Sequence, residues 1–167
     1  MASKSPNIIH TIGHSTRLRS ELASLLKKHN VDTLLDIRAI PYSGYNPQFN
    51  LETMIEEFPT SGITYEHVAS LGGITPSGTV MAAAKSCSER SRGFAEYMQS
   101  DEFRDGLNYV LSLAETGKRI ALMCAESKPE HCHRFWVADA VQEQGWQVQH
   151  IVSEDGLRDH PANLFTY

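Results

Sequence analysis

Five short apolar-rich runs alternate with segments of helical periodicity along this 167-residue chain, and that alternation constrains the fold more than any other feature. The runs span residues 7–12, 31–37, 63–67, 119–124 and 147–152. Strands that alternate with helices favour a largely parallel sheet with helices on both faces. We therefore predict an α/β fold of the three-layer sandwich type.

Apolar residues at three- and four-residue spacing mark the helical segments. The first helix follows residues 7–12, where Leu18, Leu22, Leu25 and Leu26 recur and where Ser15 and Thr16 are capping candidates. Further helices are predicted for residues 50–58 with Asn50 as cap, for a region from about 88 that is broken near 100–101 and ends at Gly117, and for 133–141. The polar tail, residues 153–167, is hard to assign.

Length and composition narrow the class of protein. A chain of 167 residues builds one proper core, so we expect a single domain over residues 1–167. The net charge of −5 disfavours extended nucleic-acid binding. No apolar run approaches the length of a membrane span and residues 1–7 lack a signal-peptide pattern, so we expect a cytoplasmic protein. The three cysteines, Cys87, Cys124 and Cys132, suit reduced thiols rather than structural disulfides.

The segment 124–134 is the most informative for chemistry, because it holds two thiols, two carboxylates, two imidazoles and a guanidinium in eleven residues. That composition is too polar for a core. The segment joins a buried strand to a helix, so it lies at the carboxyl edge of the predicted sheet, where ligands bind in α/β proteins.

Two other strand ends carry polar residues. Gly13, His14 and Ser15 follow the first run, where a glycine can let backbone N–H groups approach an anion at a helix start, although a plain turn is an equal alternative. Asp36 and Arg38 end the second run on a shared face, as a ligand clamp or as a simple ion pair.

The loop after the second run is long enough to be functional. Its residues Tyr42, Ser43 and Tyr45 can supply hydroxyls or a stacking surface for a base or a sugar, or can serve packing alone.

The segment 124–134 allows two kinds of catalysis. In one, Cys124 is a nucleophile whose thiolate is favoured by a helix N-terminus and by Arg134 or Arg38. In the other, Glu126 is the general acid or base, while Arg38 and Arg134 hold a phosphate or carboxylate and the cysteines are small buried residues.

A metal site is a further alternative. Cys124 and Cys132, with His131 or His133 and with His14, are zinc-ligand types, although their spacing is not that of a known zinc knuckle. No cofactor belongs to the leading hypothesis, whereas zinc or iron belongs to this alternative. The last interpretation is that the segment 124–134 only caps the edge of the sheet and carries no chemistry.

Several short motifs follow one another in a fixed order along the chain. They are Thr-Ile-Gly-His-Ser at 11–15, Asp-Ile-Arg at 36–38 with Pro41 and Ser43, Pro-Gln-Phe-Asn at 47–50, Tyr65, Leu-Gly-Gly at 71–73, Phe-Ala-Glu-Tyr-Met at 94–98, Cys-Ala-Glu at 124–126, Pro129, Cys-His-Arg at 132–134 and His-Ile at 150–151. Together they resemble the family catalogued as domain of unknown function 488, from about residue 9 to 151.

The resemblance implies a compact, cytosolic α/β domain whose activity is unsettled, and it adds Tyr65, Gly72 and Gly73 to the candidate site. The family pattern often carries a basic residue after the serine of the second-strand loop and another after the double glycine. This chain has Gly44 and Ile74 there. These departures from the family pattern argue against an extended anionic substrate and leave a single phosphate, held by Arg38 and Arg134, as the alternative.

We expect an enzyme with an anion-accepting pocket that acts on a phosphorylated small molecule, a nucleotide or a nucleic-acid end. Candidate catalytic residues are Cys124, Glu126, His14 and Asp36. Candidate substrate-binding residues are Gly13, Ser15, Arg38, Ser43, Tyr45, Tyr65, Gly72, Gly73, Cys132, His133 and Arg134. The competing hypothesis is a metal- or redox-responsive binding module that uses Cys124, Cys132 and His133 without turnover. The residues assign neither a reaction type nor an oligomeric state.

Overall fold

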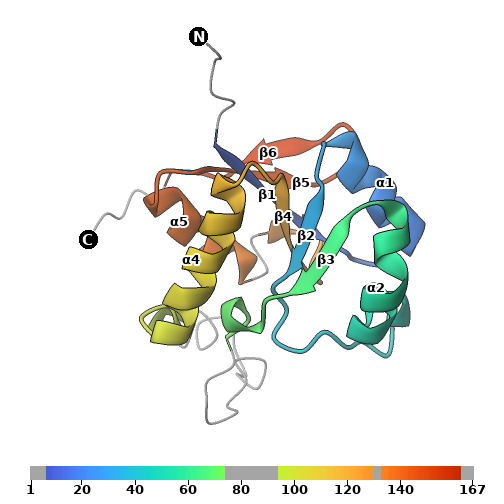
Figure 1. Cartoon of the computed structure of the whole chain (residues 1–167), viewed down its shortest axis with the longest axis horizontal. Coiled ribbons are helices and arrows are strands. Elements are labelled where there is room, and N and C mark those ends of the chain that lie inside the picture. Colours follow the sequence, from blue (N-terminus) through green and yellow to red (C-terminus); the bar gives the residue numbers. More distant parts are fainter. Residues whose placement is uncertain (1–6, 74–93, 130–132, 163–167) are drawn as a thin grey trace.

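The computed structural model describes residues 7–73, 94–129 and 133–162, in which helices flank one six-stranded sheet (Figure 1). The strands are β1 (Ile8–Gly13), β2 (Thr33–Asp36), β3 (Thr64–His67), β4 (Ile120–Cys124), β5 (Gln147–Ile151) and β6 (Leu157–Asp159). The α-helices are α1 (Arg19–Lys28), α2 (Leu51–Glu57), α4 (Asp101–Glu115) and α5 (Arg134–Glu143), with 3₁₀ turns at Pro47–Phe49, Phe58–Ser61 and Ala69–Leu71.

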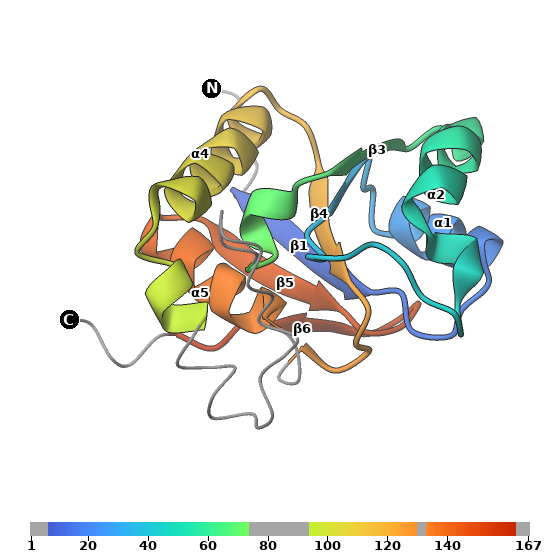
Figure 2. The same ribbon diagram turned by 90° about the horizontal axis from the view of Figure 1, so that it is seen from below.

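The sheet has the order β3-β2-β4-β1-β5-β6, in which β1 to β5 are parallel and β6 is antiparallel to β5. Helices α1 and α2 cover one face, and α4 and α5 cover the other (Figures 1 and 2). This confirms the predicted α/β fold with helices on both faces. None of the helices described is long and apolar enough to cross a membrane.

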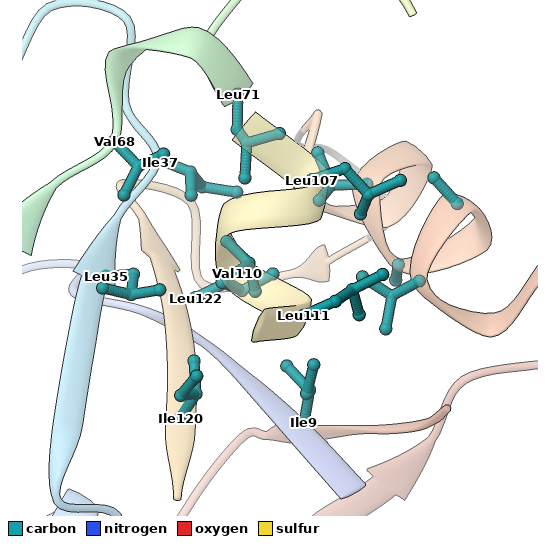
Figure 3. Close-up of a cluster of buried hydrophobic side chains, with 14 of the residues drawn as sticks. Ile9, Leu35, Ile37, Val68, Leu71, Leu107, Val110, Leu111, Ile120 and Leu122 are labelled. Atoms are coloured by element: carbon teal, nitrogen blue, oxygen red, sulfur yellow. The ribbon is translucent and has the colours of Figure 1, made fainter. Parts of the chain in front are cut away.

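Each face of the sheet has its own apolar core. Under α4 and α5, Leu35 and Leu122 of the sheet meet Leu107 and Val110 of α4 (Figure 3). On the opposite face, Leu22 and Leu26 of α1 pack in a second cluster. The strands β2 and β4 are buried along their whole length because both faces are covered, which explains the unbroken apolar sequence of β4 and the two leucines at the centre of β2.

The predicted break in the long helical region is confirmed. Helix α4 begins at Asp101, and the side chain of Ser100 caps it by accepting a hydrogen bond from the Phe103 N–H at 3.2 Å. The part of the predicted helix at residues 88–93 lies outside the described residues.

Two predictions of side-chain helix caps are wrong. Helix α1 begins only at Arg19, with Leu18 at the N-cap and no side-chain cap, so neither Ser15 nor Thr16 caps it. Asn50 does stand at the N-cap of α2, but its Oδ1 accepts from the Ser43 N–H instead. The three exposed residues of β6 lie in the tail that showed no pattern, because so short an antiparallel edge strand has no apolar alternation.

A buried polar chain joins β1 and β5 to α5. Thr11 Oγ1 lies 2.5 Å from His150 Nδ1, and His150 Nε2 lies 2.9 Å from His160 Nδ1. His160 Nε2 lies 2.6 Å from a carboxylate oxygen of Asp139, and Phe135 packs against both imidazole rings. Two neutral imidazoles satisfy all three of these hydrogen bonds. Thr11 then donates to His150, His150 donates to His160, and His160 donates to Asp139. Both histidines are therefore satisfied core residues.

The strand order brings three polar strand ends together. From β1 the chain passes through α1 to β2, whereas from β4 it passes through α5 to β5, on the other face of the sheet. The carboxyl ends of β1, β4 and β2 are adjacent, with Gly13 opposite Cys124 and Asp36 opposite Met123. Such a switch point at the carboxyl edge is where open α/β sheets bind ligands.

Candidate functional site

Backbone hydrogen bonds continue beyond the strand ends and hold the three segments side by side. The His14 N–H donates to the Cys124 carbonyl at 2.9 Å, and the Ser15 N–H donates to the Ala125 carbonyl at 3.0 Å. From the other side, the Ile37 N–H donates to the Met123 carbonyl at 2.9 Å. The loops after β1, β2 and β4 therefore form one continuous surface.

A cavity of about 300 Å³ opens on this surface. Five predicted site residues line it: His14, Ser15, Arg38, Ser43 and Glu126. Its other lining residues are Thr16, Ile40, Tyr42, Asn46, Ala125 and Ser127. The sequence prediction missed most of these six lining residues because each residue was judged by its own side chain. All six nevertheless lie within three positions of a predicted site residue.

Asp36 and Arg38 form a buried ion pair beneath the cavity. Arg38 Nε donates to one carboxylate oxygen at 2.9 Å and Arg38 Nη2 donates to the other at 2.6 Å. Although burial works against the guanidinium charge, the hydrogen bonds and charge of Asp36 raise the pKa of Arg38. Asp36 is therefore the ion-pair partner of Arg38, which is the second of the two interpretations offered for these residues in the sequence analysis.

The bend that carries this pair is held from several sides. The Tyr65 hydroxyl donates to Asp36 at 2.5 Å. His67 donates through Nε2 to the Arg38 carbonyl at 2.8 Å, and His133 donates through Nε2 to the Ile37 carbonyl at 2.7 Å. Burial, together with the charge of Asp36, raises the pKa of Tyr65, and burial lowers the pKa of His133. Tyr65 and His133 thus position the bend and do not line the cavity.

His14 is a neutral imidazole with a defined tautomer. Its Nδ1 lies 2.8 Å from the Ser15 carbonyl and must donate, so Nε2 is the acceptor for Arg38 Nη1 at 3.3 Å. Burial lowers the pKa of His14 to about 4, and the ring stacks on Phe49 at a centroid distance of 4.4 Å. The imidazole lone pair is therefore used to orient Arg38.

Only part of the Arg38 guanidinium is left for a ligand. Nε is bonded to Asp36, and Nη2 is shared between Asp36 and the Phe49 carbonyl at 2.6 Å. One hydrogen of Nη1 serves His14, so the second Nη1 hydrogen is the remaining donor. Arg38 is 6% exposed and reaches the cavity through this end.

Arg134 stabilises the loop after β4 and does not line the cavity. It is fully buried, and its Nη1 donates to the Glu126 carbonyl at 2.5 Å and to Cys124 Sγ at 2.7 Å. Its Nη2 donates to the Ser127 carbonyl at 3.2 Å. Arg134 therefore acts on the cavity through the loop that it holds.

Gly13 is required because the same loop approaches it closely. A Cβ atom at this position would lie 1.7 Å from the Glu126 carbonyl oxygen and 3.0 Å from Arg134 Nη1. The space that sequence reasoning assigned to an anion is occupied by this carbonyl.

Cys124 is disulfide-bonded, and its side chain is buried. The expectation of reduced thiols throughout is wrong for this residue, because an odd and small cysteine count argues against a disulfide framework but not against one bond. The other cysteines, Cys87 and Cys132, lie outside the described residues. A sulfur in a disulfide is not a thiolate, so nucleophilic chemistry at Cys124 requires prior reduction.

The remaining predicted residues lie away from the cavity or outside the described part. Tyr45 is 96% exposed and is not part of the cavity wall. Gly72 packs its backbone against Ala39, where a Cβ would lie 2.5 Å from Cα, so it supports the bend after β2. Gly73, with φ of +88°, belongs to the same turn. Within 7–73, 94–129 and 133–162, no group of three metal-ligating side chains occurs, and His131 of the metal alternative lies in the gap.

These features define an α/β protein with a polar cavity at the carboxyl edge of a parallel sheet, built on a buried ion pair. The model of the family described as "Domain of unknown function DUF488" matches residues 18–141. The chain belongs to this family. No curated protein and no solved structure matches the chain.

We expect Gly13→Ala to lower the free energy of unfolding by about 2–3 kcal/mol, because the new methyl group collides with backbone rather than with a movable side chain. Urea unfolding measures the change. Gly44→Ala is the matched control, since a Cβ there meets nothing within 4 Å, and it should alter stability by less than about 0.5 kcal/mol. Equal stabilities of the two variants would contradict the close approach.

We expect His14→Gln to flatten the dependence of stability on pH. Unfolded His14 takes up a proton near pH 6.5, whereas folded His14 does so only near pH 4. The unfolded state thus binds more protons between these values, and His14 makes the protein less stable as the pH falls through this window, by up to about 1.4 kcal/mol per pH unit. Urea titrations from pH 7 to pH 4 compare the two proteins. Parallel curves would show that His14 is not a buried neutral imidazole.

Proposed function

We propose that this protein is an enzyme whose cavity binds an anion and that it acts on a phosphorylated small molecule, a nucleotide or a nucleic-acid end. The observation that carries the proposal is the convergence of Arg38 and Glu126 on one cavity at the carboxyl edge of the sheet. The cavity thus offers a cation and a carboxylate to the same ligand.

Arg38 is the group that binds the anion. Its charge is secured by Asp36, and its free Nη1 hydrogen can make a charge-assisted hydrogen bond to a phosphate oxygen. Ser15 and Thr16 add neutral hydroxyl donors to the same wall. Since Arg38 is the only cation among the lining residues described, the site suits one phosphate better than a chain of them.

Glu126 is the group that moves a proton. It is exposed and is the sole carboxylate in the cavity wall as described. The other two candidates are occupied: His14 accepts from Arg38, and Asp36 accepts from Arg38 and Tyr65. We therefore assign positioning roles to His14 and Asp36, and general acid–base catalysis to Glu126.

Arg134 contributes to catalysis through the position of Glu126. Its hydrogen bond to the Glu126 carbonyl fixes the backbone from which the carboxylate projects. A general acid or base must lie within hydrogen-bond reach of its proton. The loop is held by Arg134 and by the Ser15 N–H, which donates to the Ala125 carbonyl, and this favours precise transfer.

We expect Glu126→Gln to lower turnover roughly 10²- to 10⁴-fold while the ligand still stabilises the protein. The panel contains sugar phosphates, nucleotides and phosphate-ended oligonucleotides, each beside its unphosphorylated form. Mass spectrometry follows conversion and a thermal shift follows binding. Glu115→Gln, an exposed change at the end of α4, is the control. The proposal fails if no phosphorylated compound either stabilises or is converted by the wild type, and the role of Glu126 fails if Glu126→Gln keeps the full rate.

A redox-responsive binding module is the second candidate, and the disulfide at Cys124 is the observation that favours it. Cys124 Sγ and the Glu126 carbonyl share the same donor, Arg134 Nη1. A dithiol that transfers two electrons and two protons to the disulfide would leave two thiols and would change this shared contact, and with it the cavity wall.

For this candidate we expect Cys124 to resist alkylation in protein purified without reductant and to be alkylated after dithiothreitol treatment. We also expect treatment to change the affinity for phosphate-bearing compounds at least about fivefold. Peptide mass spectrometry and calorimetry measure the two effects. Rapid alkylation of Cys124 in the untreated folded protein, or equal affinities in both states, would eliminate the redox candidate.

A further inference from the structure

The cavity has an apolar side at its mouth. Ile40 and Tyr42, two positions apart in the loop after β2, both line it, and 52% and 53% of their surfaces are exposed. Large apolar side chains scattered singly over a surface need no explanation, but two that border one polar cavity indicate a surface that a ligand covers.

The loop that carries Tyr42 is fixed before a ligand binds. Ser43 Oγ accepts from the N–H groups of Tyr45 at 3.2 Å and Asn46 at 3.0 Å. The Ser43 N–H donates to Asn50 Oδ1 at 2.8 Å, and the Leu51 N–H donates to the Pro41 carbonyl at 3.0 Å. Since these contacts hold the backbone on both sides of Tyr42, stacking a ring on this side chain loses little conformational entropy.

The cavity therefore presents three different surfaces to one ligand. Arg38 suits an anion, the hydroxyl and amide groups of Ser15, Thr16 and Asn46 suit a hydroxylated part, and Tyr42 suits a flat apolar part. A volume of about 300 Å³ is at the small end of ligand cavities. One compact ligand with all three parts fits this pattern better than a polymer.

We propose that the ligand is a single nucleoside phosphate whose base stacks on Tyr42 beside Ile40 while its phosphate contacts Arg38. This inference rests on the proposed function, because the same guanidinium binds the phosphate. Every base can stack on an aromatic ring. Tyr42 therefore distinguishes nucleotides from sugar phosphates rather than one base from another.

Calorimetry with three probes tests the proposal: adenosine 5′-monophosphate, ribose 5-phosphate, which lacks the base, and adenosine, which lacks the phosphate. Wild-type protein should bind the nucleotide roughly five- to a hundredfold more tightly than ribose 5-phosphate. Tyr42→Ala should reduce that ratio to less than about twofold, whereas Tyr42→Phe, which keeps the ring, should preserve it.

Tyr109→Ala is the matched control. The Tyr42 hydroxyl donates to Glu52 at 3.4 Å, and Tyr109, which is also partly exposed, donates in the same way to Glu66 but lies on α4. This variant should keep the wild-type ratio of the affinities for adenosine 5′-monophosphate and ribose 5-phosphate.

The outcomes separate the inference from the function on which it rests. Equal affinities for the nucleotide and ribose 5-phosphate overturn the inference and leave the proposed function standing, as does a Tyr42→Ala protein that keeps the full ratio. Adenosine that binds as tightly as the nucleotide overturns the phosphate contact at Arg38 and therefore both proposals. Absence of binding by both phosphorylated probes overturns both as well.

Discussion

The buried ion pair of Asp36 and Arg38 is the interaction on which the rest of the site depends. Transfer of two charges from water into a protein costs several kcal/mol per ion and is offset only when the partners are well aligned and fully hydrogen-bonded. Asp36 meets this condition with the backbone N–H, Nε and Nη2 of Arg38 and the hydroxyl of Tyr65. His14 and the Phe49 carbonyl complete the arrangement on the side of Arg38. The direction of Arg38, the one cation among the described lining residues, is therefore set by the core of the fold.

Desolvation divides the polar groups of the site into two kinds. Burial keeps His14 neutral by lowering its pKa and keeps Tyr65 neutral by raising its pKa, so neither of them adds a charge beside the ion pair of Asp36 and Arg38. Glu126 remains in contact with water. Buried groups thus hold the geometry of the site, whereas the Glu126 carboxylate is exposed.

The periodicity of the chain predicted the fold well because β4 is apolar throughout, β2 has an apolar centre and α4 is clearly amphipathic. It also located the cavity, since parallel strands bring their carboxyl ends to one edge. Local pattern could not show which way a side chain turns. Tyr45 and Ser43 are near neighbours in one loop, yet the first projects into solvent and the second holds the turn with its hydroxyl. The β6 strand was missed because its pairing depends on β5 and not on its own sequence.

The two arginines show why residue type alone does not define a role. Arg134 stands in the first turn of α5, and helical side chains point back toward the N-terminus, so its guanidinium meets the carbonyls of the preceding loop. The Glu126 carbonyl can approach β1 because Gly13 has no side chain. Gly13 at the end of β1 and Arg134 at the start of α5 thus form one structural unit around the loop after β4. Both residues contact the Glu126 carbonyl, and together they hold the loop that brings Glu126 to the same cavity as Arg38.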